Sequence, residues 1–278
     1  MLLQDYLSDW LTLKSAGLKP RTIEFYSYAI RHISVHLGNM DVNALTNFDV
    51  GHALAAICAQ HSRTAEMCYV LLRNAIADFP NNPMKGVSRP MHVQTSPKPW
   101  SDDQIAVYVQ SLHGHPHQIP LLLAVSLGMR RGEICGLRWS DIDFDSSTIH
   151  ICNQRQRMED GSIVDCPPKS ITSDRVIPVP VQLMKLLRDH RQIGGYVCHL
   201  TPSGLNSAHR RLVRDLGLPP IPLHGLRHSF ATACVRHGGS MKALQLLLGH
   251  SSYAITANKY TQPDMEMLRD AMDIAHIM

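Results

Sequence analysis

The sequence predicts a mainly α-helical protein with a small antiparallel β-sheet, built from a helical N-terminal domain and a mixed α+β C-terminal domain. Three observations lead to this prediction. Apolar residues recur at helical spacing along most of the 278 residues, whereas β-branched clusters are confined to residues 147–180. Prolines and glycines concentrate in residues 80–99, which excludes a continuing helix or strand. We therefore expect a helical domain over 1–92, a linker over 93–100 and a second domain over 101–278.

Four helices are expected in the N-terminal domain. Pro20 is pre-organised for a first helical turn, and Gly38 ends the apolar pattern that starts there. Thr46 with Asp49 three residues later resembles a capping box, and Ser62 is placed to cap the fourth helix. These signals put the helices at about 2–13, 20–37, 47–58 and 62–79.

The C-terminal domain begins with a capped helix and contains the predicted sheet. The hydroxyl of Ser101 can cap a helix whose third position is Gln104. β-branched runs then alternate with Gly161 and a proline pair, which is typical of a short sheet with hairpin turns. The other helices are expected at about 119–127, 181–190, 203–216, 223–237, 241–248, 254–260 and 263–277.

Composition excludes several classes of protein. With 44% hydrophobic and 18% charged residues, the chain can bury ordinary cores and is not disordered. No apolar run approaches the ~18 residues of a membrane span, and the first residues, with Asp5 and Asp9, do not resemble a signal peptide. The seven cysteines include no C-x-x-C pair, which argues for a reducing cytoplasm and against a disulfide framework or a zinc ribbon. The formal charge of +4 permits nucleic acid as a partner without requiring it.

Four separated segments carry candidate chemistry, the first of them over residues 126–141. Its sequence, SLGMRRGEICGLRWSD, places a glycine turn before Arg130 and Arg131 at the expected start of a helix. An arginine fork beside the free N–H groups of a helix start suits a phosphate. In isolation such a pair is more simply interpreted as solvated surface charge.

The second segment is His224-Gly-Leu-Arg-His228, in an expected helix. Positions i and i+3 share a face, so His224 and Arg227 can face one pocket. His224 and His228 are alternatively spaced as zinc ligands, but no glutamate follows the first histidine and the arginine between them would repel a cation. We expect no metal there, and none at His113-Gly-His-Pro-His117, which has no acidic or cysteine ligand nearby.

The third and fourth segments lie near the C-terminus. In Leu247-Leu-Gly-His250 an apolar helix is followed by a glycine C-cap and a histidine. Tyr260 follows ten residues later in the sequence NKYTQP. Alone, the first segment would be an ordinary helix end and the second a half-buried core tyrosine. A functional interpretation of either therefore depends on the order of all four segments.

Taken in order, arginine, His-x-x-Arg, Gly-His and tyrosine resemble the pattern of tyrosine recombinases of the phage-integrase type. The similarity is close over most of residues 126–262, in SLGMRRGEICGLRWSDID, HGLRHSFAT, LLLGHSS and NKYTQ. The N-terminal helices resemble the family's core-binding domain with less distinctive motifs. The resemblance implies a core-binding domain and a catalytic domain that clamp DNA between them.

The resemblance also assigns roles to individual residues. Tyr260 is the nucleophile that forms a 3′-phosphotyrosyl bond, and Lys169, in a hairpin of the sheet, is the general acid for the departing 5′-hydroxyl. Glu133 supports the first arginine without itself taking part in the chemistry. The ester conserves the bond energy, so the family's reaction needs neither a cofactor nor a metal. The set implied for catalysis is Arg130, Lys169, His224, Arg227, His250 and Tyr260.

One spacing departs from the family pattern. The tyrosine usually follows the late histidine by nine residues, whereas Tyr260 follows His250 by ten. An extra residue in the turn over 251–258 would absorb the difference. Tyr253 is the local alternative, but it comes three residues after His250 and lacks the following Thr-x-Pro sequence.

The resemblance further implies partners. The substrate is a double-stranded DNA recombination site, and the chain acts as a homo-oligomer, a tetramer in the synapse, with a free monomer left open. Host or phage DNA-bending proteins are expected accessories, no membrane is involved, and the location is the bacterial cytoplasm at the nucleoid. In the N-terminal domain the candidates for contacts with the DNA backbone are Lys14, Lys19, Arg21, Arg63 and Arg73.

The tail over residues 265–278 has an apolar helical face. It could pack on its own domain or on a neighbouring protomer, and we hypothesise the second. The biological role is interpreted as that of a phage or mobile-element integrase. Two alternatives stay open, a Xer-like resolvase of chromosome or plasmid dimers and a DNA-binding regulator that has lost strand exchange.

Overall fold

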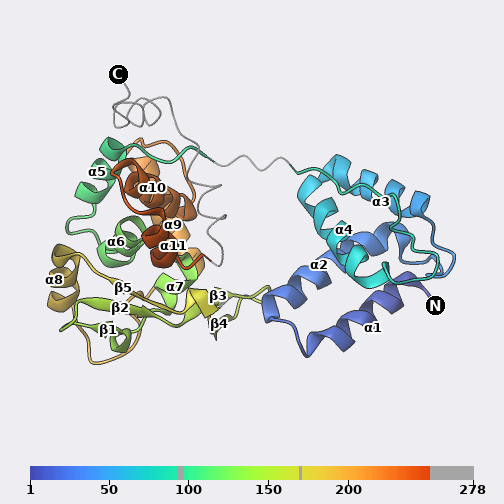
Figure 1. The fold of residues 1–278 in the computed structure, drawn as a ribbon, viewed down its shortest axis with the longest axis horizontal. Coiled ribbons are helices and arrows are strands. Elements are labelled where there is room, and N and C mark those ends of the chain that lie inside the picture. Colours follow the sequence, from blue (N-terminus) through green and yellow to red (C-terminus); the bar gives the residue numbers. More distant parts are fainter. Residues whose placement is uncertain (93–96, 169–170, 251–278) are drawn as a thin grey trace, which may run out of the picture. The chain divides into compact units, whose positions relative to one another are not determined.

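The structure is a computed structural model that describes residues 1–92, 97–168 and 171–250 (Figure 1). The chain forms two compact units, Met1–Thr95 and Ser96–Met278. Helices dominate both, and the strands of the described part lie in the second unit. The predicted fold class, mainly helical with a small antiparallel sheet, is confirmed. Among the described helices none is long and apolar enough to span a membrane.

The first unit packs four helices around one apolar core. The helices are α1 (Leu3–Ser15), α2 (Pro20–Leu37), α3 (Asn47–Gln60) and α4 (Ser62–Ile76). α4 contacts both α2 and α3, and α1 packs on α2. Leu7, Ile33 and Leu71 are fully buried in this core. The hydroxyl of Tyr6 donates to the carbonyl of Ala75 at 2.7 Å, which ties α1 to the end of α4.

The starts of α3 and α4 test two predicted caps. Thr46 Oγ1 accepts from the N–H of Asp49, and Asp49 Oδ2 accepts from the N–H of Thr46 at 3.0 Å, so the predicted capping box is confirmed. The prediction that Ser62 caps the fourth helix is wrong. Ser62 is the first residue of α4, because α3 and α4 adjoin at His61, and its hydroxyl lies 2.9 Å from His92 Nδ1 instead.

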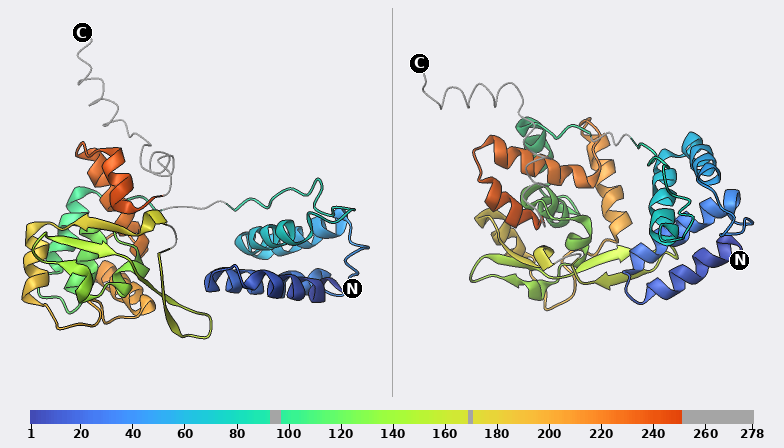
Figure 2. Two further views of the ribbon diagram at one scale, coloured as in Figure 1. Left: turned by 60° about the horizontal axis from the view of Figure 1, so that its bottom comes forward. Right: turned by 45° about the vertical axis from the view of Figure 1, so that its right-hand side comes forward.

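The second unit sets helices against a small three-stranded sheet (Figures 1 and 2). Its helices are α5 (Asp102–Ser111), α6 (Gln118–Leu127), α7 (Arg131–Gly136), α8 (Val181–Asp189), α9 (Pro202–Asp215), α10 (Leu223–Arg236) and α11 (Met241–Leu248). The sheet is antiparallel with the order β1-β2-β5, and its strands are β1 (Ile142–Asp143), β2 (Thr148–Ile151) and β5 (Arg175–Pro178). Ile149 lies opposite Ile177, and both are buried, so one face of the sheet joins the core.

The structure has a second sheet where the sequence predicts one sheet, and the predicted turn at Gly161 and strand at Ile163–Val164 belong to it. β3 (Gln154–Arg157) pairs with β4 (Ile163–Cys166) in an antiparallel hairpin, which projects from the unit (Figure 2). The sequence of β3 is Gln-Arg-Gln-Arg, and its residues are mostly half-buried. It therefore lacks the apolar alternation from which strands are predicted.

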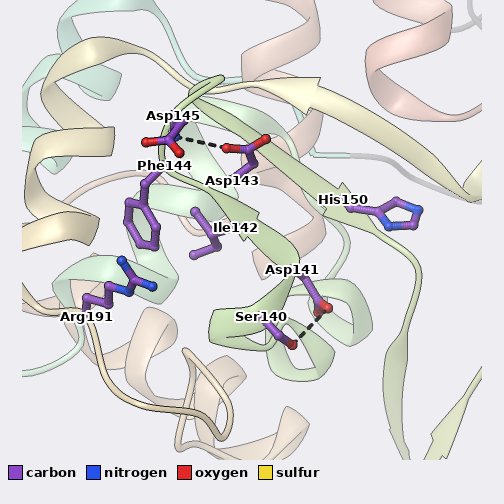
Figure 3. A pocket seen from close by; sticks show the side chains of 8 residues that line it. All are labelled: Ser140, Asp141, Ile142, Asp143, Phe144, Asp145, His150 and Arg191. Atoms are coloured by element: carbon purple, nitrogen blue, oxygen red, sulfur yellow. Dashed lines mark hydrogen bonds between the residues drawn. The ribbon is translucent and has the colours of Figure 1, made fainter.

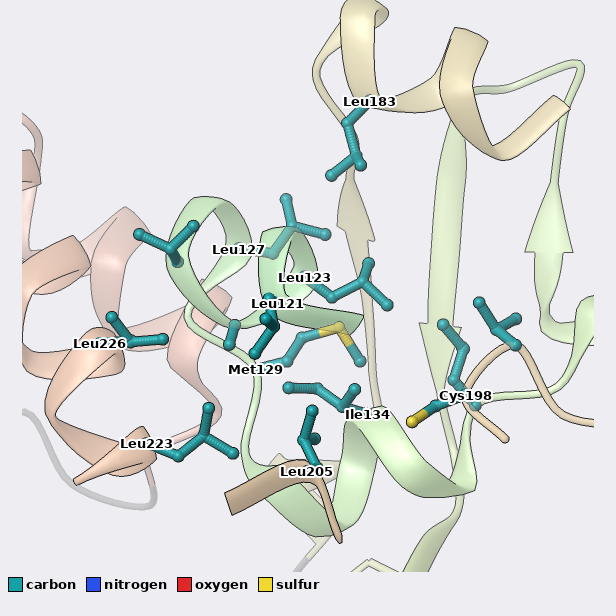
Figure 4. Packing of buried hydrophobic residues seen from close by; sticks show 14 of the residues in the cluster. Leu121, Leu123, Leu127, Met129, Ile134, Leu183, Cys198, Leu205, Leu223 and Leu226 are labelled. Atoms are coloured by element: carbon teal, nitrogen blue, oxygen red, sulfur yellow. The ribbon is translucent and has the colours of Figure 1, made fainter. Parts of the chain in front are cut away.

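Helix α6 lies within the core of the second unit. Leu121 of α6 has no exposed surface, and Ile134 of α7 and Leu226 of α10 belong to the same cluster (Figure 4). α6 contacts both α7 and α10. Consequently the two segments that carry Arg130 and Arg227 are fixed against one buried helix.

The chain enters this unit at a buried tryptophan. Trp100 is 1% exposed, its N–H donates to Ser229 Oγ of α10 at 2.9 Å, and its indole Nε1 donates to Pro219 O at 2.9 Å. Beside it, the hydroxyl of Tyr108 lies 2.9 Å from His209 Nδ1, and burial lowers the pKa of His209. The beginning of the unit is thus clipped to α10.

Candidate active site

Five of the predicted site residues lie in the described part of the second unit. Arg130 precedes α7, Glu133 lies on α7, His224 and Arg227 lie on α10, and His250 follows α11. The structure brings four of them together through hydrogen bonds, whereas His224 is exposed on the first turn of α10. Outside the described residues lie Lys169, Tyr253, Tyr260 and the tail over 265–278.

A glycine turn positions Arg130. Gly128 ends α6 with φ of 60°, and a Cβ atom there would lie 2.6 Å from the ring of Phe230. Only glycine meets both conditions without strain. The backbone is then extended at Arg130, whose N–H donates to Glu133 Oε2 at 2.8 Å. The local sequence therefore fixes Arg130 at the junction of α6 and α7.

Glu133 is a buried carboxylate, only 5% exposed, held by two guanidinium groups. Arg130 Nη1 donates to Oε1 at 2.7 Å, while Arg175 donates from Nη1 to Oε1 and from Nη2 to Oε2, each at 3.1 Å. Burial by itself raises the pKa of Glu133, but the hydrogen bonds and charges of Arg175 and Arg130 outweigh it and hold the pKa below its ordinary value. The carboxylate is ionised and anchors both arginines.

The C-terminal end of α11 is bound by three arginines. The last carbonyls of a helix have no partner within the helix and need another donor. Here three consecutive carbonyls each accept from a different guanidinium group. The bonds are Arg175 Nε to Leu247 O at 2.7 Å, Arg227 Nη2 to Leu248 O at 2.6 Å and Arg130 Nη2 to Gly249 O at 3.2 Å. Segments far apart in sequence therefore converge on this helix end.

Arg227 is 1% exposed and bridges two helix ends. Its Nη1 donates to Gly128 O at 2.7 Å, and its Nη2 lies 3.0 Å from His250 Nε2. Because a guanidinium group only donates, His250 Nε2 accepts this bond, and the ring proton is on Nδ1. The His250 carbonyl accepts from Gln245 Nε2 at 3.2 Å, which holds His250 against α11, two residues after the helix ends.

His224 lies one helical turn before Arg227. Its ring is 4.8 Å from the ring of His228, edge to face. In the part of the chain that the structure describes, no group of three or more His, Cys, Asp or Glu residues could hold a metal ion. In the loop before α6, the N–H of His117 donates to His115 Nδ1 at 3.0 Å.

The cationic residues predicted to contact DNA from the first unit differ in their surroundings. Arg21 pairs with Glu24 at 2.6 Å, and Arg63 pairs with Glu66 on the same helix, so part of their charge is compensated. Lys14, Lys19 and Arg73 are exposed. Their contacts with DNA stay predictions.

Two groups at the site are missed by reasoning from sequence alone. Arg175 stands in the sequence DRVIPVP, where an arginine after Asp174 at the start of an apolar strand is the available signal. Asp165 of β4 accepts from Tyr196 Oη at 2.5 Å and from Arg138 Nη2 at 3.1 Å, and the guanidinium of Arg155 lies 4.3 Å from the ring centre of Tyr196. This cluster fixes the hairpin whose second strand ends three residues before position 169.

A surface pocket of about 460 Å³ lies beside β1 and is distinct from these residues (Figure 3). Asp141, Asp143 and Asp145 line it with His150 and Arg191. Three carboxylates repel an anionic phosphodiester. The pocket is therefore unsuited to bind the substrate that the arginines fit.

Comparisons with known proteins agree with this geometry. The model of the phage integrase family matches residues 103–267, and that of the phage integrase N-terminal SAM-like domain matches residues 2–52. A tyrosine recombinase XerC-like protein of Caldanaerobacter subterraneus is 30% identical over 200 residues, which are 61% of this chain and 51% of that protein. The match thus spans about half the length of this relative.

Two further relatives match over more of their length. A putative prophage phiRv2 integrase of Mycobacterium tuberculosis is 27% identical over 271 residues, covering 89% of this chain and 71% of that protein. The tyrosine recombinase XerC of Xylella fastidiosa is 24% identical over 290 residues, covering 94% and 92%.

Solved structures share the fold. The Tn1549 transposon integrase in complex with transposon right end DNA aligns with a TM-score of 0.80 at 19% identity, over 99% of each chain. A lambda integrase tetramer bound to a Holliday junction aligns with a TM-score of 0.68 at 19% identity, over 96% of this chain and 80% of that one. With its family model matched over more than half of its length, the chain belongs to the phage integrase family of tyrosine recombinases, which cleave and rejoin DNA strands.

Proposed function

We propose that this protein is a site-specific DNA recombinase of the integrase type, which exchanges strands between two DNA sites through a 3′-phosphotyrosyl intermediate. One observation carries the proposal. Arg130 and Arg227, from different segments, both bind the end of α11, where the ring of His250 accepts from Arg227 at 3.0 Å. Two fixed guanidinium groups beside an imidazole suit the phosphoryl group of a DNA strand under attack.

The arginines would stabilise the transition state. A phosphodiester is anionic and gains charge on its non-bridging oxygens as the pentacoordinate transition state forms. Arg227 is held by two carbonyls and Arg130 by the Glu133 carboxylate, so neither has to reorient when this charge develops.

Tyr260 and Lys169 would complete the reaction. The phenol oxygen of Tyr260 bonds to phosphorus as the bond to the 5′-oxygen breaks, and its proton passes to His224. Lys169 gives a proton to the departing 5′-oxygen. The 5′-hydroxyl of the partner strand then attacks the phosphotyrosyl ester and releases Tyr260, so the reaction needs no external energy source.

A nicked suicide substrate tests this proposal. The substrate is made from the DNA that flanks the gene, since integrase genes often lie beside their own attachment sites. We expect a covalent protein–DNA adduct on a denaturing gel, lost in Tyr260→Phe and retained in Tyr253→Phe, the matched control. No adduct with any candidate site would contradict catalysis and favour a DNA-binding regulator.

A resolvase of the Xer type is the second candidate, favoured by the match to 92% of the length of a XerC protein. Recombination assays separate the two roles. An integrase joins two different sites on separate molecules, whereas a resolvase recombines two identical sites on one plasmid. Adding a host extract to each assay reports whether accessory DNA-bending proteins are required.

We also propose that four protomers assemble in the synapse and that the tail over residues 265–278 docks on a neighbouring protomer. Truncation after Gln262 should then leave binding to one site intact and abolish cooperative assembly of two sites in a gel-shift assay. Retention of cooperative assembly by the truncated protein would contradict the docking in trans.

A further inference from the structure

Arg175 makes four hydrogen bonds beside the site. Its side chain is 7% exposed. It donates to both carboxylate oxygens of Glu133 at 3.1 Å, to Leu247 O at 2.7 Å and to Ser173 O at 3.0 Å. The side chain therefore joins α7, the end of α11 and its own strand.

These contacts decide what Arg175 can do. A guanidinium group has five N–H donors, and four of those of Arg175 are used by these bonds. Little donor capacity is left for a phosphate. Its effect must pass through Glu133, which holds Arg130, and through the helix end that precedes His250.

We propose that Arg175 is a positioning residue for DNA cleavage, an inference that rests on the proposed function. It ties the Glu133 carboxylate to the end of α11, so that Arg130 and His250 keep a fixed separation. Without Arg175, the buried Glu133 carboxylate would lose two charged hydrogen bonds, and the Leu247 carbonyl would lose a donor. Glu133 would then no longer hold Arg130 in a fixed position.

The guanidinium group of Arg175 packs closely against the backbone of Gly249. A Cβ atom on Gly249 would lie 3.0 Å from Arg175 Nη1 and 2.8 Å from Thr172 O. The glycine and the arginine therefore fit one another directly. A lysine at position 175 would keep the charge but could not reach both carboxylate oxygens and the Leu247 carbonyl at once.

The test compares wild type with Arg175→Lys and Arg175→Gln in single-turnover cleavage of the suicide substrate. Arg236→Gln is the matched control, because Arg236 forms a 3.0 Å ion pair with Asp102 away from the site. Each protein is also assayed for DNA affinity and thermal unfolding. A second substrate carries a neutral methylphosphonate at the scissile position, where the charge that Arg130 compensates is absent.

We expect both Arg175 variants to cleave the ordinary substrate about 10- to 100-fold more slowly, since misplacement by about 1 Å has effects of this size. DNA affinity should stay within about 2-fold, and Arg236→Gln should cleave at the wild-type rate. On the methylphosphonate the defect should shrink to about 3-fold or less, because the charge-compensating role of Arg130 is no longer needed.

Three results would overturn the inference. These are wild-type cleavage by Arg175→Lys, an equal defect on both substrates, and the loss of a cooperative unfolding transition in Arg175→Lys, which would assign the residue to folding. Failure of the proposed function is distinct from these, because wild-type protein would then form no adduct with either substrate.

Discussion

Two glutamates of this protein share a local sequence pattern but lie in different surroundings. Arg63 and Glu66 on α4, like Arg130 and Glu133 at α7, follow the pattern Arg-x-x-Glu, and a second arginine completes each cluster. At Glu66 both arginines are about 60% exposed, as Arg63 is 62% and Arg89 60% exposed. Glu133 and its second arginine are nearly buried.

The comparison indicates that burial, rather than the sequence pattern, determines how much such a cluster matters for the stability of the fold. Exposed ion pairs contribute about 0–1 kcal/mol, because water and salt screen them. A buried pair gains little over an apolar core while it is intact, but removing one partner leaves an uncompensated charge. The cluster at Glu66 is therefore replaceable, whereas the cluster at Glu133 determines where three backbone segments meet.

The largest expected effect comes from neutralising the two glutamates separately. Glu133→Gln should lower the free energy of unfolding by about 3–5 kcal/mol and slow DNA cleavage, because two arginines lose a buried counter-charge. Glu66→Gln, the matched control, should cost about 1 kcal/mol or less and leave cleavage unchanged. Urea denaturation and the cleavage assay measure both. Equal losses of stability would refute the distinction.

A pair of glycine substitutions tests how closely the buried cluster is packed. Gly249 and Gly86 both have positive φ, of 62° and 79°, so alanine is strained at either. A Cβ atom at Gly249 meets the Thr172 carbonyl and Arg175, whereas nothing lies within 4 Å of one at Gly86. Gly86→Ala should cost about 1–2 kcal/mol from backbone strain alone, and Gly249→Ala clearly more. Similar costs in denaturation experiments would show that the helix end tolerates a shift.

Acidification should reduce the contribution of the Glu133 carboxylate to the free energy of unfolding. Its pKa lies below the ordinary value in the folded state, so its stabilisation is fully present above the unfolded-state pKa of about 4.3. The stabilisation is lost as pH falls through the folded-state pKa. The difference in unfolding free energy between wild type and Glu133→Gln, measured from pH 7 down to pH 3, should therefore narrow. A gap independent of pH would mean that the carboxylate is not ionised.

Salt should produce the smallest effect and separate the clusters again. Raising NaCl from about 0.05 to 1 M shortens the Debye length from over 10 Å to about 3 Å. The stability difference between wild type and Glu66→Gln, under about 1 kcal/mol at the start, should approach zero. The difference for Glu133→Gln should change little, because its charges are buried. A larger salt effect for Glu133→Gln than for Glu66→Gln would contradict the argument that the charges at Glu133 are buried and those at Glu66 exposed.

Sequence reasoning brings together residues that the structure places near one another, because these residues sit in short, ordered motifs. Arg130 and Glu133 come from one helix start, and a left-handed glycine precedes them, as the pattern indicates. His250 follows a glycine C-cap in the expected way. Each of these features depends on neighbours within a few residues.

Features that depend on distant residues are not predictable in the same way. The bond between Arg175 and Glu133 spans 42 positions, and nothing near Arg175 identifies its partner. The hairpin of β3 and β4 has a polar first strand, and its contact between Asp165 and Tyr196 is equally remote in sequence. The failed cap at Ser62 has a local cause, since only His61 separates α3 from α4 and takes the N-cap position itself.

The hydrogen bond between Trp100 and Ser229 limits how far a force on the preceding chain is transmitted into the second unit. Tension applied upstream of Trp100 must break its N–H···Oγ bond and withdraw an indole from the core before it can move α10. Ser229 lies two residues after Arg227, so this hydrogen bond holds the helix that carries the arginine in place. Proteolytic cleavage before Trp100 should therefore leave the core of the second unit intact, whereas cleavage just after it would remove the Trp100 side chain from that core.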